Sequence, residues 1–142
     1  MQRENRRSQN RPQGRSDQAS DEIKRRIAGL DSLSKYGAKE LVEDAKNLAK
    51  DMRELKTAQT RKIYGTVKSL EMDFRTGEFD RDRVFLLLPK LAYAANKKRE
   101  VRPLQEVLEE CIFKIREGRE GKEDFSRFVA FFEAILAYHR ER

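Results

Sequence analysis

The chain has 142 residues, enough for one domain, and 40% of them are charged while 37% are hydrophobic, a balance that suits helices with one buried stripe. One Cys, one His and no Trp exclude a Cys/His zinc site and a disulfide framework within the chain, and we expect neither a metal nor a cofactor. The formal charge of +7 predicts attraction to a polyanion.

The hydropathy pattern predicts a soluble, cytoplasmic protein. Purely apolar runs are too short to cross a bilayer, and the N-terminus lacks the apolar region of a secretory signal. Residues 57–70 hold three basic residues and no acid, and residues 81–102 hold seven basic residues against Asp82 and Glu100. These two stretches are the basic part of the expected domain.

Residues 1–19 carry five Arg and almost no apolar residue, so they cannot offset the entropy of ordering. We interpret them as a disordered Arg-rich arm, followed by a single domain over residues 20–142. Ser20 and Asp21 can cap a short first helix. A second helix follows Gly37, with a heptad-like apolar stripe from Leu41 to Leu55.

A third helix is predicted from Thr57, a candidate cap, with the buried stripe Ile63, Val67, Leu70 and Phe74. Its opposite face carries Arg61, Gly65 and Lys68. Because Gly costs about 1 kcal/mol in a helix interior, Gly65 favours either close approach of another backbone or a solvated face with a tolerated Gly. The spacing leaves both interpretations open.

A fourth helix, capped by Asp80 or Asp82, runs through residues 86–98, and Pro89 must kink or split it. If the helical phase survives, Arg83, Lys90 and Lys97 form one stripe beside Tyr93. Such a basic ridge suits a phosphate backbone, with the aromatic ring stacking on an exposed base. The alternative is that Tyr93 packs against a neighbouring helix and the cations are merely solvated.

Pro103 opens a fifth helix, in which Cys111 is a core residue. The last helix, from about Asp124, has an apolar arc wider than one packed surface needs. One part faces the core: Phe125, Val129, Phe132 and Leu136. The other part is a predicted protein interface, with deeper burial in the same domain as the alternative: Phe128, Phe131, Ile135 and Tyr138.

No pattern of catalytic residues emerges. His139 stands near the C-terminus among Arg140, Glu141 and Arg142, and no nucleophile has a base at a telling spacing. The sequence therefore predicts a noncatalytic protein.

Three stretches together resemble a known family: residues 57–64 (TAQTRKIY), 87–95 (LLPKLAYAA) and 124–135 (DFSRFVAFFEAI). They are similar to the small helical subunit of type III-A CRISPR effector complexes, the Csm complex. The resemblance covers about residues 40–139 and agrees in the order and spacing of the motifs.

The resemblance implies an all-α subunit of an RNA-guided antiviral complex that is not itself an enzyme. Stacked copies would form the inner filament, alongside a repeating backbone subunit and a large polymerase-like subunit, and would hold guide CRISPR RNA and single-stranded target RNA. With the basic stretches, it gives ten predicted RNA-binding residues: Gln59, Arg61, Lys62, Lys68, Arg83, Lys90, Tyr93, Lys97, Lys98 and Arg99.

We therefore expect a compact bundle of five or six helices that binds RNA through phosphate contacts, with sequence selection left to base pairing. The alternative is a homodimeric helical adaptor that binds other proteins and no RNA. Tight self-association through the Phe128 and Tyr138 side, without bound RNA, would distinguish it.

Overall fold

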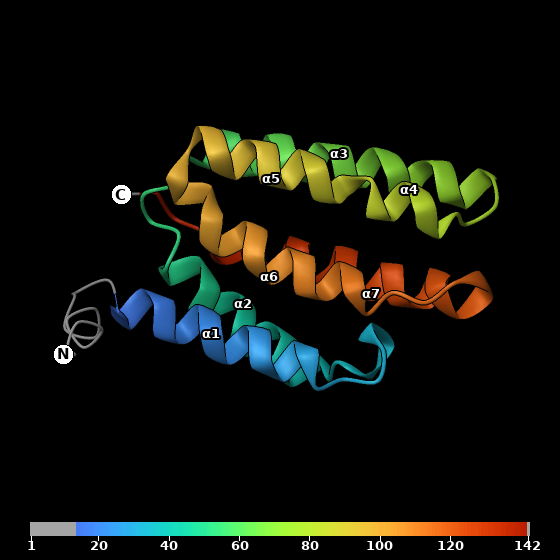
Figure 1. The fold of residues 1–142 in the computed structure, drawn as a ribbon, viewed down its shortest axis with the longest axis horizontal. Helices are drawn as coiled ribbons and strands as arrows, with labels where there is room; N and C mark the ends of the chain where they lie inside the picture. The colour runs from blue at the N-terminus through green and yellow to red at the C-terminus, as the bar shows by residue number, and fades with distance from the viewer. Residues whose placement is uncertain (1–13, 142) are drawn as a thin grey trace, which may run out of the picture.

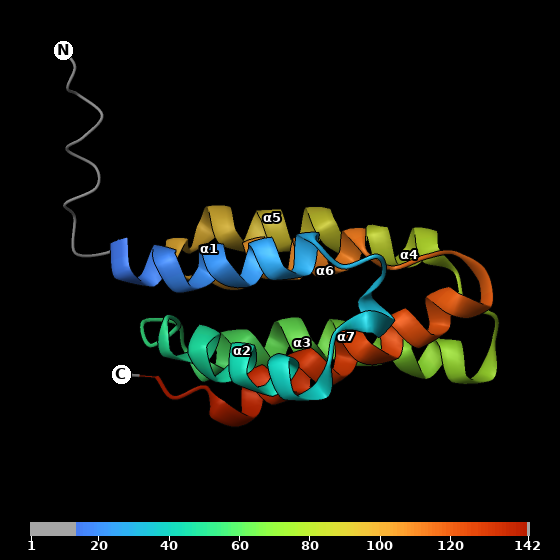
Figure 2. The ribbon, with the colours of Figure 1, turned by 90° about the horizontal axis from the view of Figure 1, so that it is seen from below.

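The computed structural model describes residues 14–141, which form helices and connecting loops with no strand among them. The helices are arranged in two layers (Figures 1 and 2). One layer holds α1 (Gly14–Ala28), α6 (Arg102–Phe113) and the pair α4 (Arg81–Phe85) and α5 (Leu87–Lys97). The other holds α2 (Ala38–Lys50), α7 (Gly118–Tyr138) and α3 (Thr57–Thr76). The described residues also form two short 3₁₀ turns, η2 (Leu33–Lys35) and η3 (Arg99–Val101).

Within each layer the middle helix contacts both of its neighbours. α6 packs against α1 and α5, and α7 packs against α2 and α3. The bundle therefore has α3 and α5 along one edge and α1 and α2 along the opposite edge, as Figure 1 shows. With α4 and α5 counted as one interrupted helix, the predicted all-α bundle of five or six helices is confirmed.

The first helix begins at Gly14 and not near Ser20, so Ser20 is a buried residue inside α1 and not its cap. The predicted arm over residues 1–19 falls for its larger part on residues 1–13, which lie outside the described residues. Ile23 and Ile27, about one helical turn apart in α1, are both buried.

The predicted break near Pro89 is a split. α4 ends at Phe85 and α5 begins at Leu87, which places Pro89 in the first turn of α5, where the missing N–H costs no hydrogen bond. Asp80 is the cap of α4, because its side chain accepts a hydrogen bond from the backbone N of Asp82 at 3.0 Å. Asp82 lies within the first turn.

Two buried carboxylates connect distant elements. Asp44 in α2 accepts a hydrogen bond from Tyr36 Oη at 2.6 Å and from Arg26 Nε of α1 at 2.9 Å. Asp124 in α7 accepts from the backbone N of Ser34 and of Arg116, each at 2.9 Å, and from Arg116 Nε at 3.0 Å. Because each carboxylate is paired and fully hydrogen-bonded, its burial is tolerated.

Candidate nucleic-acid interface

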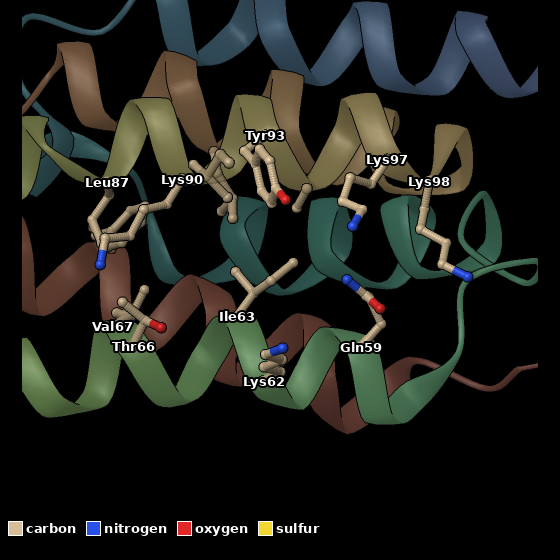
Figure 3. Close-up of a pocket in the computed structure, with 14 residues that line it drawn as sticks. Gln59, Lys62, Ile63, Thr66, Val67, Leu87, Lys90, Tyr93, Lys97 and Lys98 are labelled. Atoms are coloured by element: carbon tan, nitrogen blue, oxygen red, sulfur yellow. The ribbon is translucent and has the colours of Figure 1, made fainter.

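A groove of about 530 Å³ lies between α3 and α5 at one edge of the bundle (Figure 3). These two helices belong to different layers, so each packs on its own middle helix, α7 or α6. Figure 3 shows Tyr93 and Lys97 reaching from α5 toward Gln59 and Ile63 on α3. Polar side chains therefore stand on both walls, Gln59 on α3 and Tyr93 and Lys97 on α5.

The bottom of this groove, which we call the α3–α5 groove, is apolar. Leu108 of α6 and Phe128 of α7 close it from below, and both are fully buried. The lower walls come from side chains of the two edge helices: Ile63, Val67, Leu87 and Leu91. The apolar stripes of four helices thus meet beneath the basic rim.

The rim of the groove is basic. Lys62 stands on α3, Lys90 and Lys97 stand on α5, and Lys98 follows α5. A second hollow of about 590 Å³ shares Lys62 and Lys90 and extends the groove toward Arg83. Because neither hollow is lined by an acidic residue, the cations add to one positive potential along the edge.

Arg83 differs from the groove lysines, because it has an acidic partner. Its Nη2 lies 2.8 Å from Asp73 Oδ2 of α3, and its guanidinium lies 5.8 Å from the centre of the Phe74 ring. The side chain remains half-exposed. Arg83 therefore connects α4 to α3 at the far end of the groove.

Tyr93 is 65% exposed, so the alternative that it packs against a neighbouring helix is wrong. Lys97 Nζ lies 5.5 Å from the centre of the Tyr93 ring, within cation–π range. An exposed aromatic ring and a cation are thus held together on α5. Lys90, Tyr93 and Lys97 line the groove together from α5, whereas Arg83 of the predicted stripe belongs to α4 and lines only the second hollow.

Three of the ten predicted RNA-binding residues line neither hollow: Arg61, Lys68 and Arg99. Lys68 Nζ lies 2.7 Å from Glu71 Oε1 and 3.7 Å from Glu133 Oε2 of α7, and the hydrogen bond to Glu71 raises its pKa. Arg61 and Arg99 are exposed. Their RNA contacts stay predictions, on surfaces outside the groove.

The predicted protein interface on the last helix is wrong for three of its four residues. Phe128, Phe131 and Ile135 have no exposed surface, and Phe131 packs edge-on against the Tyr36 ring at 5.3 Å. α7 needs a wide apolar arc because it is the middle helix of its layer. Tyr138 alone is exposed, with Lys46 Nζ 5.5 Å from its ring centre.

The cap of α3 is also not the predicted one. Thr57 is the first residue of the helix, and its backbone N and Oγ1 donate to Glu141 Oε1 at 2.7 and 2.8 Å. These bonds lower the pKa of Glu141. The side chain that accepts the hydrogen bond from the first backbone N–H of α3 therefore belongs to the C-terminal segment. Local sequence patterns could not predict this distant partner.

Cys111 and His139, the single Cys and His of the chain, are both buried. Cys111 is fully buried, as predicted, and burial raises the pKa of its thiol. His139 Nε2 donates a hydrogen bond to the carbonyl oxygen of Met52 at 2.9 Å. Within residues 14–141, no three His, Cys, Asp or Glu side chains are grouped to hold a metal, and no helix has the length and apolarity to cross a membrane.

The fold and the groove define an all-helical protein with a basic edge suited to a polyanion. Residues 35–142 match the family model described as Csm2 Type III-A. The chain belongs to this family and is a small subunit of the type III-A CRISPR complex, the Csm complex. No curated protein and no solved structure gives a significant match.

Proposed function

We propose that the chain is a noncatalytic subunit that holds the guide and target RNA strands of the complex through phosphate contacts in the α3–α5 groove. The observation that carries this function is the charge of the groove: Lys62, Lys90, Lys97 and Lys98 line it without an acid among them. Lysine ammonium groups on a rigid edge can each neutralise a phosphate and release a counterion.

The same contacts supply affinity without sequence readout. Phosphates are identical along an RNA strand, so binding through them fixes the position of the strand and leaves the choice of target to base pairing. Family membership supports this division, because the chain is a subunit of a CRISPR complex, and in CRISPR complexes base pairing with the guide RNA selects the target. We infer that several copies lie side by side as an inner filament, next to the backbone and large subunits, in antiviral defence.

The structure does not support the feature that suggested the adaptor alternative. It depended on an apolar face of the last helix, and Phe128, Phe131 and Ile135 of that face are buried. The exposed basic edge favours RNA. Self-association of the isolated chain remains compatible with either function.

The test is the salt dependence of RNA binding by the full chain. Lys62→Gln with Lys90→Gln should weaken binding of single-stranded RNA and flatten the plot of log affinity against log salt, by about 0.7 in slope per lysine. The matched control is Lys35→Gln with Lys39→Gln, exposed lysines at η2 and α2 on the opposite edge. Equal effects of the two pairs would contradict the groove assignment.

A further inference from the structure

The α3–α5 groove has a feature that phosphate binding does not require. A phosphate is strongly hydrated and gains nothing from an apolar surface. Beneath the lysine rim, however, Ile63 and Ala94 are only partly covered, and the edges of Leu87 and Leu91 continue the apolar wall. A ligand that matches both parts carries negative charge outside and a flat apolar body inside.

Tyr93 supplies a surface for such a body. The residue is 65% exposed, and its ring lies over the groove opposite Ile63 (Figure 3). The Lys97 ammonium, 5.5 Å from the ring centre, helps hold the ring in place. Because Tyr93 lies inside α5, its backbone is already ordered. Stacking an apolar group on its ring would therefore cost little backbone entropy.

The size and polarity of the groove further restrict the class of ligand that it can hold. The groove volume of about 530 Å³ falls within the range of roughly 300–1,000 Å³ of sites that enclose small organic groups, so it accommodates one nucleobase. The Gln59 amide stands at the end of the groove near Lys97 (Figure 3). An amide offers one donor group and one acceptor, which match the edge of an unpaired base.

We propose that the α3–α5 groove is a receptor for one unpaired RNA base, stacked on Tyr93, while Lys90 and Lys97 bind the phosphates on either side of it. This inference rests on the proposed RNA-binding function and adds a nucleotide-sized site to it. The subunit then prefers RNA with an accessible base over a fully paired helix, whatever the identity of that base.

The test compares two probes of equal length and charge, single-stranded oligoadenylate and an abasic ribose-phosphate oligomer. Both bind the lysines, and only the first can fill the groove. The full chain should bind oligoadenylate about 5- to 150-fold more tightly, as expected for one stacked base. Tyr93→Ala should remove this preference, and Tyr93→Phe should retain it because the ring remains.

The salt dependence separates this site from the lysine rim. Tyr93→Ala should lower oligoadenylate affinity by the same factor at every salt concentration, whereas Lys90→Gln should change the slope. A 2-aminopurine placed in the oligonucleotide should be quenched by the wild-type chain and not by Tyr93→Ala. These variants change exposed side chains, and circular dichroism checks that they fold.

The outcomes for the two proposals differ. Equal affinity of the wild-type chain for both probes, with dependence on the lysines, would overturn the base receptor and leave RNA binding intact. Binding of neither probe, alone or in the assembled complex, would overturn both proposals. Loss of another protein subunit from the complex on Tyr93→Ala, with RNA affinity unchanged, would assign the groove to a protein side chain and overturn the base receptor.

Discussion

Glu141 Oε1 accepts hydrogen bonds from both the backbone N and Oγ1 of Thr57, at 2.7 and 2.8 Å. The C-terminal segment therefore caps the helix that forms one wall of the groove. A negative charge at a helix N-terminus is also favoured by the helix dipole. The position of Gln59, within the first turn of α3, depends on this contact.

Glu141→Gln should lower the melting temperature at neutral pH. The pKa of Glu141 is lowered by the Thr57 hydrogen bonds from its ordinary value of 4.5, so its contribution to stability is complete above that value and is lost as the pH falls through the lower folded-state pKa. The gap between wild type and variant should close on acidification. A gap that is unchanged from pH 7 to pH 3 would show that the charge has no such role.

Asp124→Asn should destabilise the fold. Burial raises the pKa of this carboxyl, but the hydrogen bonds from Arg116 and from the Ser34 backbone outweigh burial and hold it below its ordinary value. The side-chain NH₂ of Asn would face one of the N–H donors of Ser34 or Arg116 that now bind the carboxylate. Two donors facing each other in a buried site cost about 1–3 kcal/mol. Urea denaturation measures this cost, with Glu123→Gln on the exposed side of α7 as the control.

Phe131→Ala should reduce the free energy of unfolding by about 3–5 kcal/mol, because it empties a packed site beside Tyr36. Tyr138→Ala, at the exposed end of the helix, should cost about 1 kcal/mol or less. Chemical denaturation together with sedimentation checks both variants. Dissociation of a dimer by Phe131→Ala without loss of stability would restore the interface interpretation.

Two helix glycines should respond in opposite directions to Ala. A Cβ at Gly121 in α7 would overlap the carbonyl oxygen of Arg116 and the Phe79 ring, so Gly121→Ala should destabilise by about 1–3 kcal/mol. A Cβ at Gly65 in α3 meets nothing within 4 Å, so Gly65→Ala should stabilise by up to about 1 kcal/mol. Thermal unfolding distinguishes them. If Gly65→Ala stabilises the chain yet impairs assembly, a partner backbone lies against it.

Local patterns predicted most of the helices, because apolar spacing and the break at Pro89 depend on neighbours in sequence. The wide arc of α7 was ambiguous, since periodicity does not say whether Phe128 meets another helix of this chain or another molecule. The cap at Thr57 was mispredicted because its partner, Glu141, is distant in sequence. Both features depend on contacts between residues that are distant in sequence, so local sequence patterns do not predict them.

The candidate site was predictable in part for the same reason. Charge counts identified the cations of residues 57–70 and 81–102, and helical phase placed Lys90 and Lys97 beside Tyr93. The sequence did not show that α3 and α5 face each other across a groove, because this depends on how the two layers pack. It therefore could not show that Lys62 lines the groove while its neighbour Arg61 does not. The apolar bottom at Leu108 and Phe128 had no signal of its own, because core residues look alike in sequence.

The most direct test of the central claim is ultraviolet cross-linking of RNA within the assembled, purified complex, followed by mass spectrometry of this subunit. RNA bound in the α3–α5 groove should cross-link to peptides that contain residues 59–66 of α3 and residues 90–98, which end α5 and include Lys98 directly after it. Cross-links confined to α1 and α2, on the opposite edge of the bundle, would contradict the claim that this groove binds RNA.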